Sequence, residues 1–357
     1  MKFYKFFLIF LFINPVFSNQ EYRYQLQSDT VKIAFGGDTH FVWGIEEYQE
    51  RKGINSQISY IKELLQQFDF RALNLETAFS KNAKSVDFTN YVFRSSPEQI
   101  QVLKDLGLNL AIFANNHSMD LGLQGLQDTI KHFQEYQIPF VGMGNDLNQA
   151  LEPYIVEIHG VKFAFFAISF IGRKEDFADG KKSGIGKVHP LLFQKIKDAK
   201  TKQKVDYVFL SVHWGMEYQP FPSEEQKRWK NQFFQQGVNF IIGHHPHIPQ
   251  GIEVYNDKAI VYSLGNFLFG SLNYYQDNNI VAVFHFDRAS KKFIGIEVFP
   301  ISGKNRKYDF QPKLPTYEDR KELFQKLYIL SKKEQPNQTI LISNTWDSMF
   351  FKVPAEQ

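Results

Sequence analysis

The histidines of this chain gather in a few short motifs whose side chains could bind metal ions. Six of the ten histidines lie in such motifs, and the other four are scattered singly. The densest motif is Gly243-His244-His245-Pro246-His247, and closely spaced imidazoles of this kind are typical of metal sites. The other motifs, in chain order, are Asp38-Thr39-His40, Asn74-Leu75-Glu76, Asn115-Asn116-His117 and His213-Trp214.

These residue types predict a site for two divalent metal ions. Carboxylate, imidazole and amide oxygen are ligands for Mn, Fe, Zn or Mg, and the chain has no cysteine that could supply a thiolate. Two such ions about 3.5–4 Å apart can acidify a water molecule and hold a phosphoryl group. Each motif alone also has an ordinary explanation, since Asp38 could cap a turn and Asn115-Asn116 could form one. All five motifs together favour a shared site.

Each motif follows a predicted strand. Short apolar runs alternate with amphipathic stretches from Val31 onward, as is typical of an α/β fold. The carboxyl ends of strands in an open α/β sheet share one edge, where ligands bind, so we expect the motifs to converge there. The five strands concerned are predicted at 31–35, 71–75, 109–113, 205–212 and 238–242.

The remaining elements follow from the same periodicity. Further strands are predicted within 154–168, with a turn at Gly160, and at 252–255, 259–262, 279–286 and 293–299. Helices are predicted at 57–68, 97–106, 122–136, 191–202 and 223–236. After Ile301 the chain becomes polar and weakly periodic, apart from one helix at 317–332. We therefore predict a domain at 19–301 and a peripheral extension at 302–357.

The N-terminus has the pattern of a secretory signal. Lys2 and Lys5 precede an apolar run at 6–17, and a small residue, Ser18, stands before the predicted cut. Residues 1–18 are predicted to be a signal peptide, and an uncleaved membrane anchor is the alternative. The apolar run is shorter than the roughly 20 residues that span a bilayer. This predicts an exported protein, either periplasmic or at the cell surface.

Composition narrows the classes of partner. The formal net charge is +3 without a long basic block, so nucleic acid is not an expected partner. The absence of cysteine excludes a disulfide and a lipid anchor on cysteine. The 37 phenylalanines are interpreted as bulky core residues.

The order of the motifs resembles the calcineurin-like metallophosphoesterase superfamily, and most closely its CapA branch, the poly-γ-glutamate capsule biosynthesis proteins also called PgsA. The resemblance runs from about Val31 to Phe269. It implies a four-layer αββα sandwich with mixed sheets. It rests on Asn74-Leu75-Glu76, Phe93-Arg94, Ala114-Asn115-Asn116-His117 with Asp120 and Gly122, His213-Trp214-Gly215 with Glu217-Tyr218, Gly243-His244-His245-Pro246-His247 with Gln250, and Tyr262-Ser263-Leu264-Gly265-Asn266-Phe267.

The resemblance also implies individual roles. The implied metal ligands are Asp38, His40 and His247 for the first ion, Asn116, His213 and His245 for the second, and Glu76 as the bridge. By the same resemblance, His117 takes the place of the group that protonates a leaving oxygen, and Asp120 would hold that imidazole in one tautomer. Arg94 is a candidate phosphate ligand or an ordinary surface ion pair. His244 is either a substrate contact or a neighbour of the ligands.

Two positions depart from the related patterns. The superfamily usually bridges its metals with Asp, whereas Glu76 is longer by one methylene. CapA proteins often carry an apolar residue where His40 stands, so this chain resembles the complete metal site more closely. The resemblance implies a role in making or exporting the polymer beside membrane synthase or export partners. The site would hydrolyse a phosphoester or bind an anionic polymer, and a periplasmic phosphoesterase unrelated to capsule is the alternative.

Overall fold

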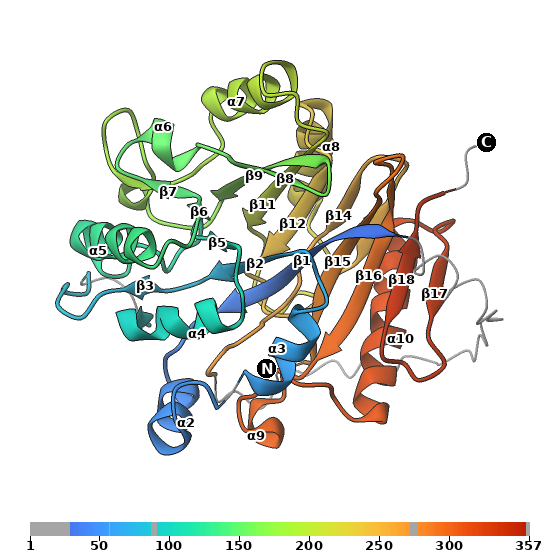
Figure 1. The fold of residues 1–357 in the computed structure, drawn as a ribbon, viewed down its shortest axis with the longest axis horizontal. Coiled ribbons are helices and arrows are strands. Elements are labelled where there is room, and N and C mark those ends of the chain that lie inside the picture. The colour runs from blue at the N-terminus through green and yellow to red at the C-terminus, as the bar shows by residue number, and fades with distance from the viewer. Residues whose placement is uncertain (1–28, 57, 87–90, 272–276, 355–357) are drawn as a thin grey trace, which may run out of the picture.

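Two large β-sheets pack face to face and carry helices on both outer faces (Figure 1). The computed structural model describes residues 29–56, 58–86, 91–271 and 277–354. The layers run helix, sheet, sheet, helix, so the predicted αββα sandwich with mixed sheets is confirmed. The predicted signal peptide at 1–18 lies outside the described residues. Within the described ranges, no helix is long and apolar enough to cross a membrane.

The first sheet has eight strands. In spatial order they are β17 (Ile340–Ile342), β18 (Met349–Lys352), β16 (Phe293–Ile301), β15 (Asn279–Asp287), β1 (Thr30–Thr39), β2 (Phe70–Leu75), β5 (Leu110–Ile112) and β6 (Phe140–Val141). The half from β1 to β6 is parallel, and the half from β15 to β17 is antiparallel. The carboxyl ends of β1, β2 and β5 therefore lie along one edge.

The second sheet has six strands. In spatial order they are β13 (Ile252–Val254), β14 (Ala259–Val261), β12 (Phe240–His244), β11 (Tyr207–His213), β9 (Val161–Ser169) and β8 (Tyr154–Ile158). Its four central strands are parallel, and both outer strands run antiparallel to their neighbours. Two short pairs complete the strands: β3 (Ala78–Phe79) with β4 (Arg94–Ser95), and β7 (Met143–Gly144) with β10 (Gly184–Ile185).

Phenylalanine fills the space between the two sheets. Val31, Ile33 and Phe35 on alternate positions of β1 face this core, as the twofold side-chain period of a strand requires. Phe165 and Phe209 of the opposite sheet stack with ring centroids 5.1 Å apart. Burying each such ring contributes about 1.5–3 kcal/mol. The interpretation of the many phenylalanines as core residues is confirmed for these positions.

The helices divide between the outer faces. The first sheet is covered by α2 (Gly44–Lys52), α3 (Ser59–Leu65), α4 (Ile100–Asp105) and α5 (Gly122–Glu135). The second sheet is covered by α6 (Leu147–Ala150), α7 (Pro190–Thr201) and α8 (Glu224–Gln235). The N-cap of α8 is Ser223, which accepts a hydrogen bond from the Gln226 backbone in a capping box. Short turns of helix are η1 (Pro97–Gln99), η2 (Lys174–Asp176) and α9 (Asn305–Tyr308).

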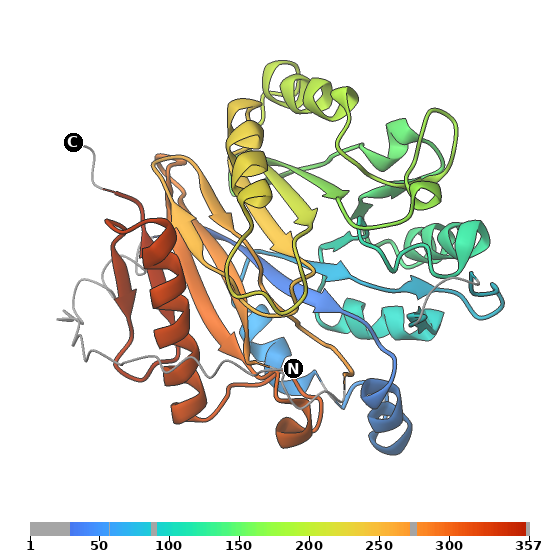
Figure 2. The same ribbon diagram turned by 180° about the vertical axis from the view of Figure 1, so that it is seen from behind.

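The segment after Ile301 is integrated into the fold, whereas we predicted a peripheral cover. Leu323, Phe324 and Leu327 of α10 (Tyr317–Glu334) are buried in the core between the sheets. Figure 2 shows this helix, in red, running beside the strands at the C-terminal end of the chain. Strands β17 and β18 extend the first sheet beyond β16. Their shortness explains the wrong prediction, because three or four residues are too few to show a periodic pattern.

Candidate metal centre

The predicted motifs meet where the ends of β1, β2 and β5 in one sheet face the ends of β11 and β12 in the other. Asp38 closes β1, and its Oδ2 accepts a hydrogen bond from the His245 backbone N at 3.0 Å. His213 closes β11, and its Nε2 lies 2.6 Å from Oδ1 of Asn116 and 3.5 Å from Oε1 of Glu76. The two sheets therefore bring these motifs together, as the sequence predicts.

Asp38 is held by residues from both sheets. Asn74 donates a hydrogen bond to Asp38 Oδ1 at 2.7 Å, and Asn115 donates in turn to Asn74 Oδ1 at 3.2 Å. His247 Nδ1 lies 3.4 Å from Asp38 Oδ2 and 2.8 Å from Oδ1 of Asn266. With its Nδ1 directed at these oxygens, the other ring nitrogen of His247 is left for a ligand, as in carboxylate–histidine–metal arrangements.

Close backbone approaches make this arrangement possible. A Cβ at Gly37 would lie 1.9 Å from the Gly265 carbonyl oxygen, and one at Gly243 would lie 1.8 Å from that of Tyr262. No larger residue fits at either position. His245 and His247 adopt φ angles of 94° and 58°, a region that costs non-glycine residues about 1–3 kcal/mol. The surrounding fold holds this strained loop against Asp38.

Glu76 is a buried carboxylate without a donor. It is 0 % exposed, and neither of its oxygens has a hydrogen-bond partner among the described residues. Burial and the nearby Asp38 carboxylate raise the pKa of Glu76 to about 8. Burial alone would also raise the pKa of Asp38, but His244 and His247 hold it well below its usual value. A buried carboxylate that lacks a donor is costly, and a cation would satisfy it.

The side chains form three overlapping groups of possible ligands. In each group, one ligand atom from every member lies within 4.8 Å of the others. The groups are Asp38 with Glu76 and His247, Glu76 with His213 and His245, and Glu217 with His245 and His247. The first two groups share Glu76, the predicted bridge. Buried oxygen and nitrogen donors without thiolate suit a divalent metal, so the residues present fit this kind of ion.

Three imidazoles in or beside the cluster have lowered pKa values, which favour the neutral form that binds metal. Burial and the neighbouring imidazoles of His213 and His247 lower the pKa of His245 to about 2. Burial also holds the pKa of His40 and of His213 well below the usual value. His247 differs: burial opposes its protonation, but the carboxylates of Glu76 and Asp38 outweigh burial and raise its pKa to about 9.

The predicted pair of His117 and Asp120 lies at the mouth of the cluster. His117 Nδ1 donates to Asp120 Oδ2 at 2.8 Å, which leaves Nε2 directed toward Glu76 Oε1 at 4.0 Å. The Phe93 ring stacks on the His117 imidazole with centroids 3.9 Å apart. Burial lowers the pKa of His117, but Asp120 and Glu76 outweigh burial and raise it. The His117 side chain is 15 % exposed, so it can meet a ligand from solvent.

His40 lies beside the cluster but outside the three ligand groups. Its ring packs against Trp43, Phe93 and Phe269, with a centroid distance of 4.0 Å to Phe269. The Val42 backbone donates to its Nδ1 at 3.2 Å. Its Nε2 is buried and has no hydrogen-bond partner among the described residues. Ligation by His40 stays a prediction from the resemblance.

Neither of the two predicted substrate contacts, His244 and Arg94, is open to solvent at the cluster. His244 is 1 % exposed and lies behind Asp38, with Nδ1 3.4 Å from Asp38 Oδ1, so substrate cannot reach it from solvent. Arg94 points away from the cluster and donates to the Lys81 carbonyl at 3.2 Å. Its neighbour Phe93, by contrast, stacks on His117.

The sequence analysis missed the placement of Glu217 and Asn266. Glu217 lies four residues after His213, in a motif that was quoted without a role for this residue. Asn266 orients His247, and its motif, Gly265-Asn266-Phe267, was also quoted without a role. Both motifs were visible, but which of their residues turn toward the cluster depends on how two distant loops meet.

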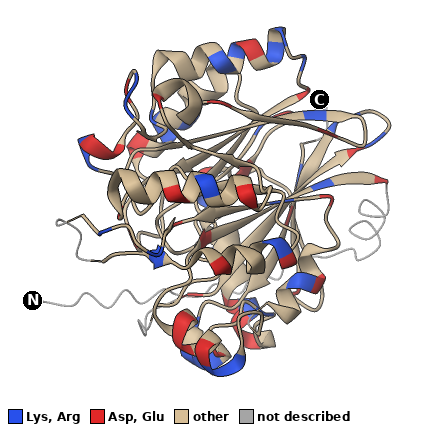
Figure 3. Ribbon diagram, turned by 60° about the vertical axis from the view of Figure 1, so that its left-hand side comes forward, with Lys and Arg blue, Asp and Glu red and all other residues tan. Residues whose placement is uncertain are grey.

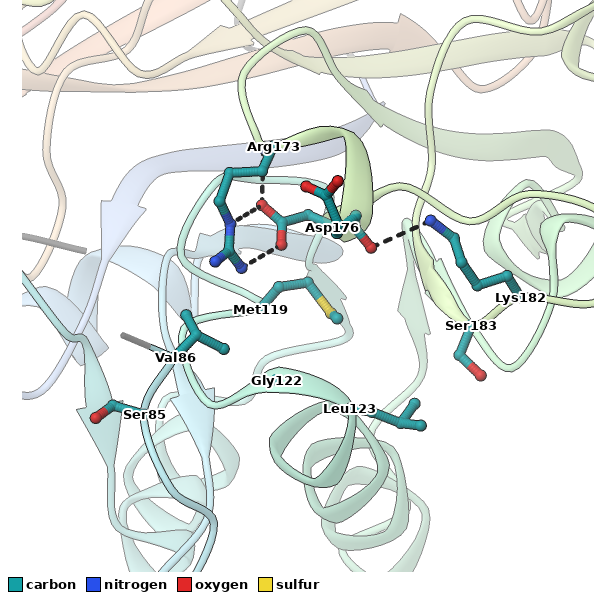
Figure 4. Close-up of a pocket in the computed structure, with 10 residues that line it drawn as sticks. Ser85, Val86, Met119, Gly122, Leu123, Arg173, Asp176, Lys182 and Ser183 are labelled. Atoms are coloured by element: carbon teal, nitrogen blue, oxygen red, sulfur yellow. Dashed lines mark hydrogen bonds and ion pairs between the residues drawn. The ribbon is translucent and has the colours of Figure 1, made fainter. Parts of the chain in front are cut away.

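A cavity of about 530 Å³ adjoins the segment that carries His117 and Asp120 (Figure 4). Met119 and Gly122 form part of its wall. Across the cavity, Arg173 donates through Nε to Asp176 Oδ2 at 3.0 Å. Figure 3 shows acidic and basic residues interspersed along the helices of the ribbon.

Comparison with known proteins settles the family. A family model described as "Bacterial capsule synthesis protein PGA_cap" matches residues 32–271. The chain belongs to this family. The predicted resemblance to the CapA branch is thereby confirmed.

Named relatives extend this result. The chain is 33 % identical to the PGA biosynthesis protein CapA of Bacillus subtilis, over 68 % of this chain and 64 % of that protein. It is 28 % identical to the capsule biosynthesis protein CapA of Bacillus anthracis, over 68 % and 61 % respectively. The match thus spans less than two thirds of the length of either relative. Among solved structures, Haemophilus influenzae NAD nucleotidase is similar with a TM-score of 0.46 and 12 % identity, over 77 % of this chain and 50 % of that one.

Proposed function

We propose that this protein is a metal-dependent phosphoesterase-type hydrolase with two metal ions, acting in the biosynthesis or export of a capsule polymer such as poly-γ-glutamate. The observation that carries the hydrolase proposal is Glu76. This carboxylate is fully buried without a donor among the described residues, and it belongs to two ligand groups at once. That arrangement is what a carboxylate bridging two cations requires.

The chemistry divides between the metal ligands and the exposed histidine. Divalent ions held by the ligand groups would acidify a water molecule and neutralise the charge on phosphoryl oxygens. His117, through Nε2, would donate its proton to the leaving oxygen. Asp120 keeps the proton of the other ring nitrogen in place and favours the protonated imidazole. The raised pKa of His117 suits an acid, since the proton must be present before bond cleavage.

The capsule role is supported by the family and by the relatives, whose names describe capsule and PGA biosynthesis. We further propose that the protein is exported under the signal at 1–18 and acts beside membrane synthase or export partners on an anionic substrate. Binding of polymer carboxylates without hydrolysis is the second candidate, and a periplasmic phosphoesterase unrelated to capsule is the third. The His117–Asp120 pair favours hydrolysis over binding, because a site that only binds polymer has no need of a proton donor.

Metal analysis followed by an ester assay tests the proposal. We expect purified protein to retain Mn at more than one ion per chain and to hydrolyse a generic aryl phosphate ester. His117→Ala should reduce kcat about 10²- to 10⁴-fold with metal content unchanged. His132→Ala, a partly exposed histidine paired with Glu135, serves as the control and should behave as wild type.

Two results would contradict parts of the proposal. Metal content well below one ion per chain would contradict the proposal that the protein is a metal-dependent hydrolase. Full metal content with binding of poly-γ-glutamate, but with no ester hydrolysis, would instead identify a polymer-binding protein.

A further inference from the structure

Glu217 places a carboxylate on the solvent side of the metal centre. It follows β11 in an exposed segment, and one of its oxygens lies within 4.8 Å of an imidazole nitrogen of both His245 and His247. It forms no hydrogen bond or ion pair with the described residues. An exposed acid with no partner is ordinary on a surface, but one directed at two buried imidazoles is not.

Glu217 and Glu76 share the same two histidines as neighbours. Glu76 groups with His245 and, separately, with His247, and Glu217 groups with both at once. Glu76 is fully buried, whereas Glu217 is exposed. The Glu217 charge also contributes to the raised pKa of Glu76, as expected of two carboxylates near the same histidines.

The backbone on both sides of Glu217 is tied to the histidine loop. The Trp214 backbone N donates to the His244 carbonyl at 3.1 Å, and the Tyr218 backbone N donates to the Pro246 carbonyl at 2.8 Å. Between these two contacts the chain turns through Gly215, which has a φ of 87°. Because these bonds hold the backbone, Glu217 stays within reach of the cluster while its side chain keeps rotamer freedom.

We infer that Glu217 is an exchangeable ligand, which binds the metal centre from the solvent side and is displaced by the anionic group of an incoming substrate. This inference rests on the proposed metal site. Asp38, Glu76 and His213 are buried, whereas Glu217 is exposed, so Glu217 is the member of the three ligand groups that an anion can meet from solvent. Carboxylate and phosphate oxygens are alternative hard donors for the same cations. Glu217 therefore strengthens metal binding and weakens anion binding.

Titrations of Glu217→Gln test both effects. Mn²⁺ binding to the metal-free full chain, followed by calorimetry, should weaken at least about 10-fold in the variant. Inorganic phosphate binding to the Mn-saturated variant should tighten about 5-fold, because a competing negative charge has been removed. Glu225→Gln is the matched control, since this exposed acid lies on α8 beside Arg228, and both affinities should stay at the wild-type value.

The other outcomes each have a distinct meaning. Unchanged Mn²⁺ and phosphate affinities in Glu217→Gln would overturn the inference and leave the metal site intact. Weaker binding of both Mn²⁺ and phosphate would make Glu217 a permanent ligand, which also overturns displacement. Absence of Mn²⁺ binding in the wild-type protein would overturn the proposed function and this inference together. Asp38→Asn should abolish Mn²⁺ binding. This variant therefore distinguishes the loss of a buried ligand from the loss of Glu217.

Discussion

Two buried carboxylates, Glu76 and Glu253, have opposite surroundings. Glu253 on β13 is 2 % exposed, and Lys230 Nζ donates to both of its oxygens at 2.9 and 3.1 Å. Tyr262 donates to Glu253 Oε1 at 2.7 Å, and the Tyr255 hydroxyl donates to Oε2. Glu76 is as deeply buried, but it has no donor among the described residues and has imidazoles around it.

The difference shows that burial alone does not indicate function. The protein itself satisfies the Glu253 carboxylate, so this cluster stabilises the packing of β13 against α8 in any metal state. The fold leaves the Glu76 carboxylate without a hydrogen-bond donor among the described residues, and an added cation or proton completes that cluster. One cluster stabilises the fold from within, and the other makes stability depend on a ligand.

The largest expected effect comes from breaking the Glu253 cluster. Lys230→Met leaves the buried Glu253 carboxylate without its counter-charge, and we expect the free energy of unfolding to fall by about 3–5 kcal/mol. Urea denaturation, with and without Mn²⁺, measures this loss, which should be equal in both conditions. Lys202→Met removes an exposed lysine paired with Asp198 and should change stability by less than about 1 kcal/mol. A metal-dependent loss in Lys230→Met would mean that the two clusters are not independent.

Metal removal should affect only the Glu76 cluster. Free Mn²⁺ at 100 times its dissociation constant should raise the free energy of unfolding by about 2.7 kcal/mol relative to protein in chelator. Glu76→Gln should abolish this difference, because an amide cannot replace a bridging carboxylate. Glu157→Gln, an exposed position on β8, should keep it. Thermal unfolding with and without chelator measures all three proteins. If Mn²⁺ stabilises Glu76→Gln as much as wild type, Glu76 is not a metal ligand.

The same contrast explains how far the sequence could be interpreted. The two-sheet fold and the ligand motifs were predictable, because each strand and each motif is a contiguous stretch such as Gly243 to His247. What the sequence could not show is that the protein supplies donors to the Glu253 carboxylate but none, among the described residues, to that of Glu76. Whether a buried acid has a donor depends on Lys230 and Tyr262, which reach Glu253 only after α8, β13 and β14 have packed together.

The orientations of two motif residues could not be predicted for the same reason. Arg94 and His244 both adjoin true members of the cluster in the chain, but the fold directs one outward and buries the other. Strand alternation and the exact meeting of two loops decide such orientations, and neither follows from motif spacing. Strands β17 and β18 were missed because both are short, and β18 joins the sheet only through a long-range pairing with β16.

The smallest expected effect is the pH dependence of the stability of the metal-free protein. It distinguishes the Glu76 cluster from the Glu253 cluster directly. Glu76 has a pKa of about 8 in the folded state, above that of an unfolded glutamate, so it favours folding while protonated and less so as pH rises toward 8. His247 has a folded pKa of about 9, so its contribution is complete below its unfolded pKa of about 6.5 and is lost above that pH. Both contributions fall between pH 6.5 and 8.

In chelator, we therefore expect the free energy of unfolding to fall by about 1–2 kcal/mol from pH 6.5 to 8. Below pH 6.5 stability should fall again, because His213 and His245 have lowered pKa values and must stay neutral in the folded state. Saturating Mn²⁺ should remove the alkaline decline, since a cation then neutralises the carboxylates in place of protons. Glu76→Gln in chelator should reduce that decline. Urea denaturation across this pH range measures these changes. If the stability of the wild-type protein in chelator is the same at pH 6.5 and at pH 8, the Glu76 cluster is satisfied without a ligand, as the Glu253 cluster is.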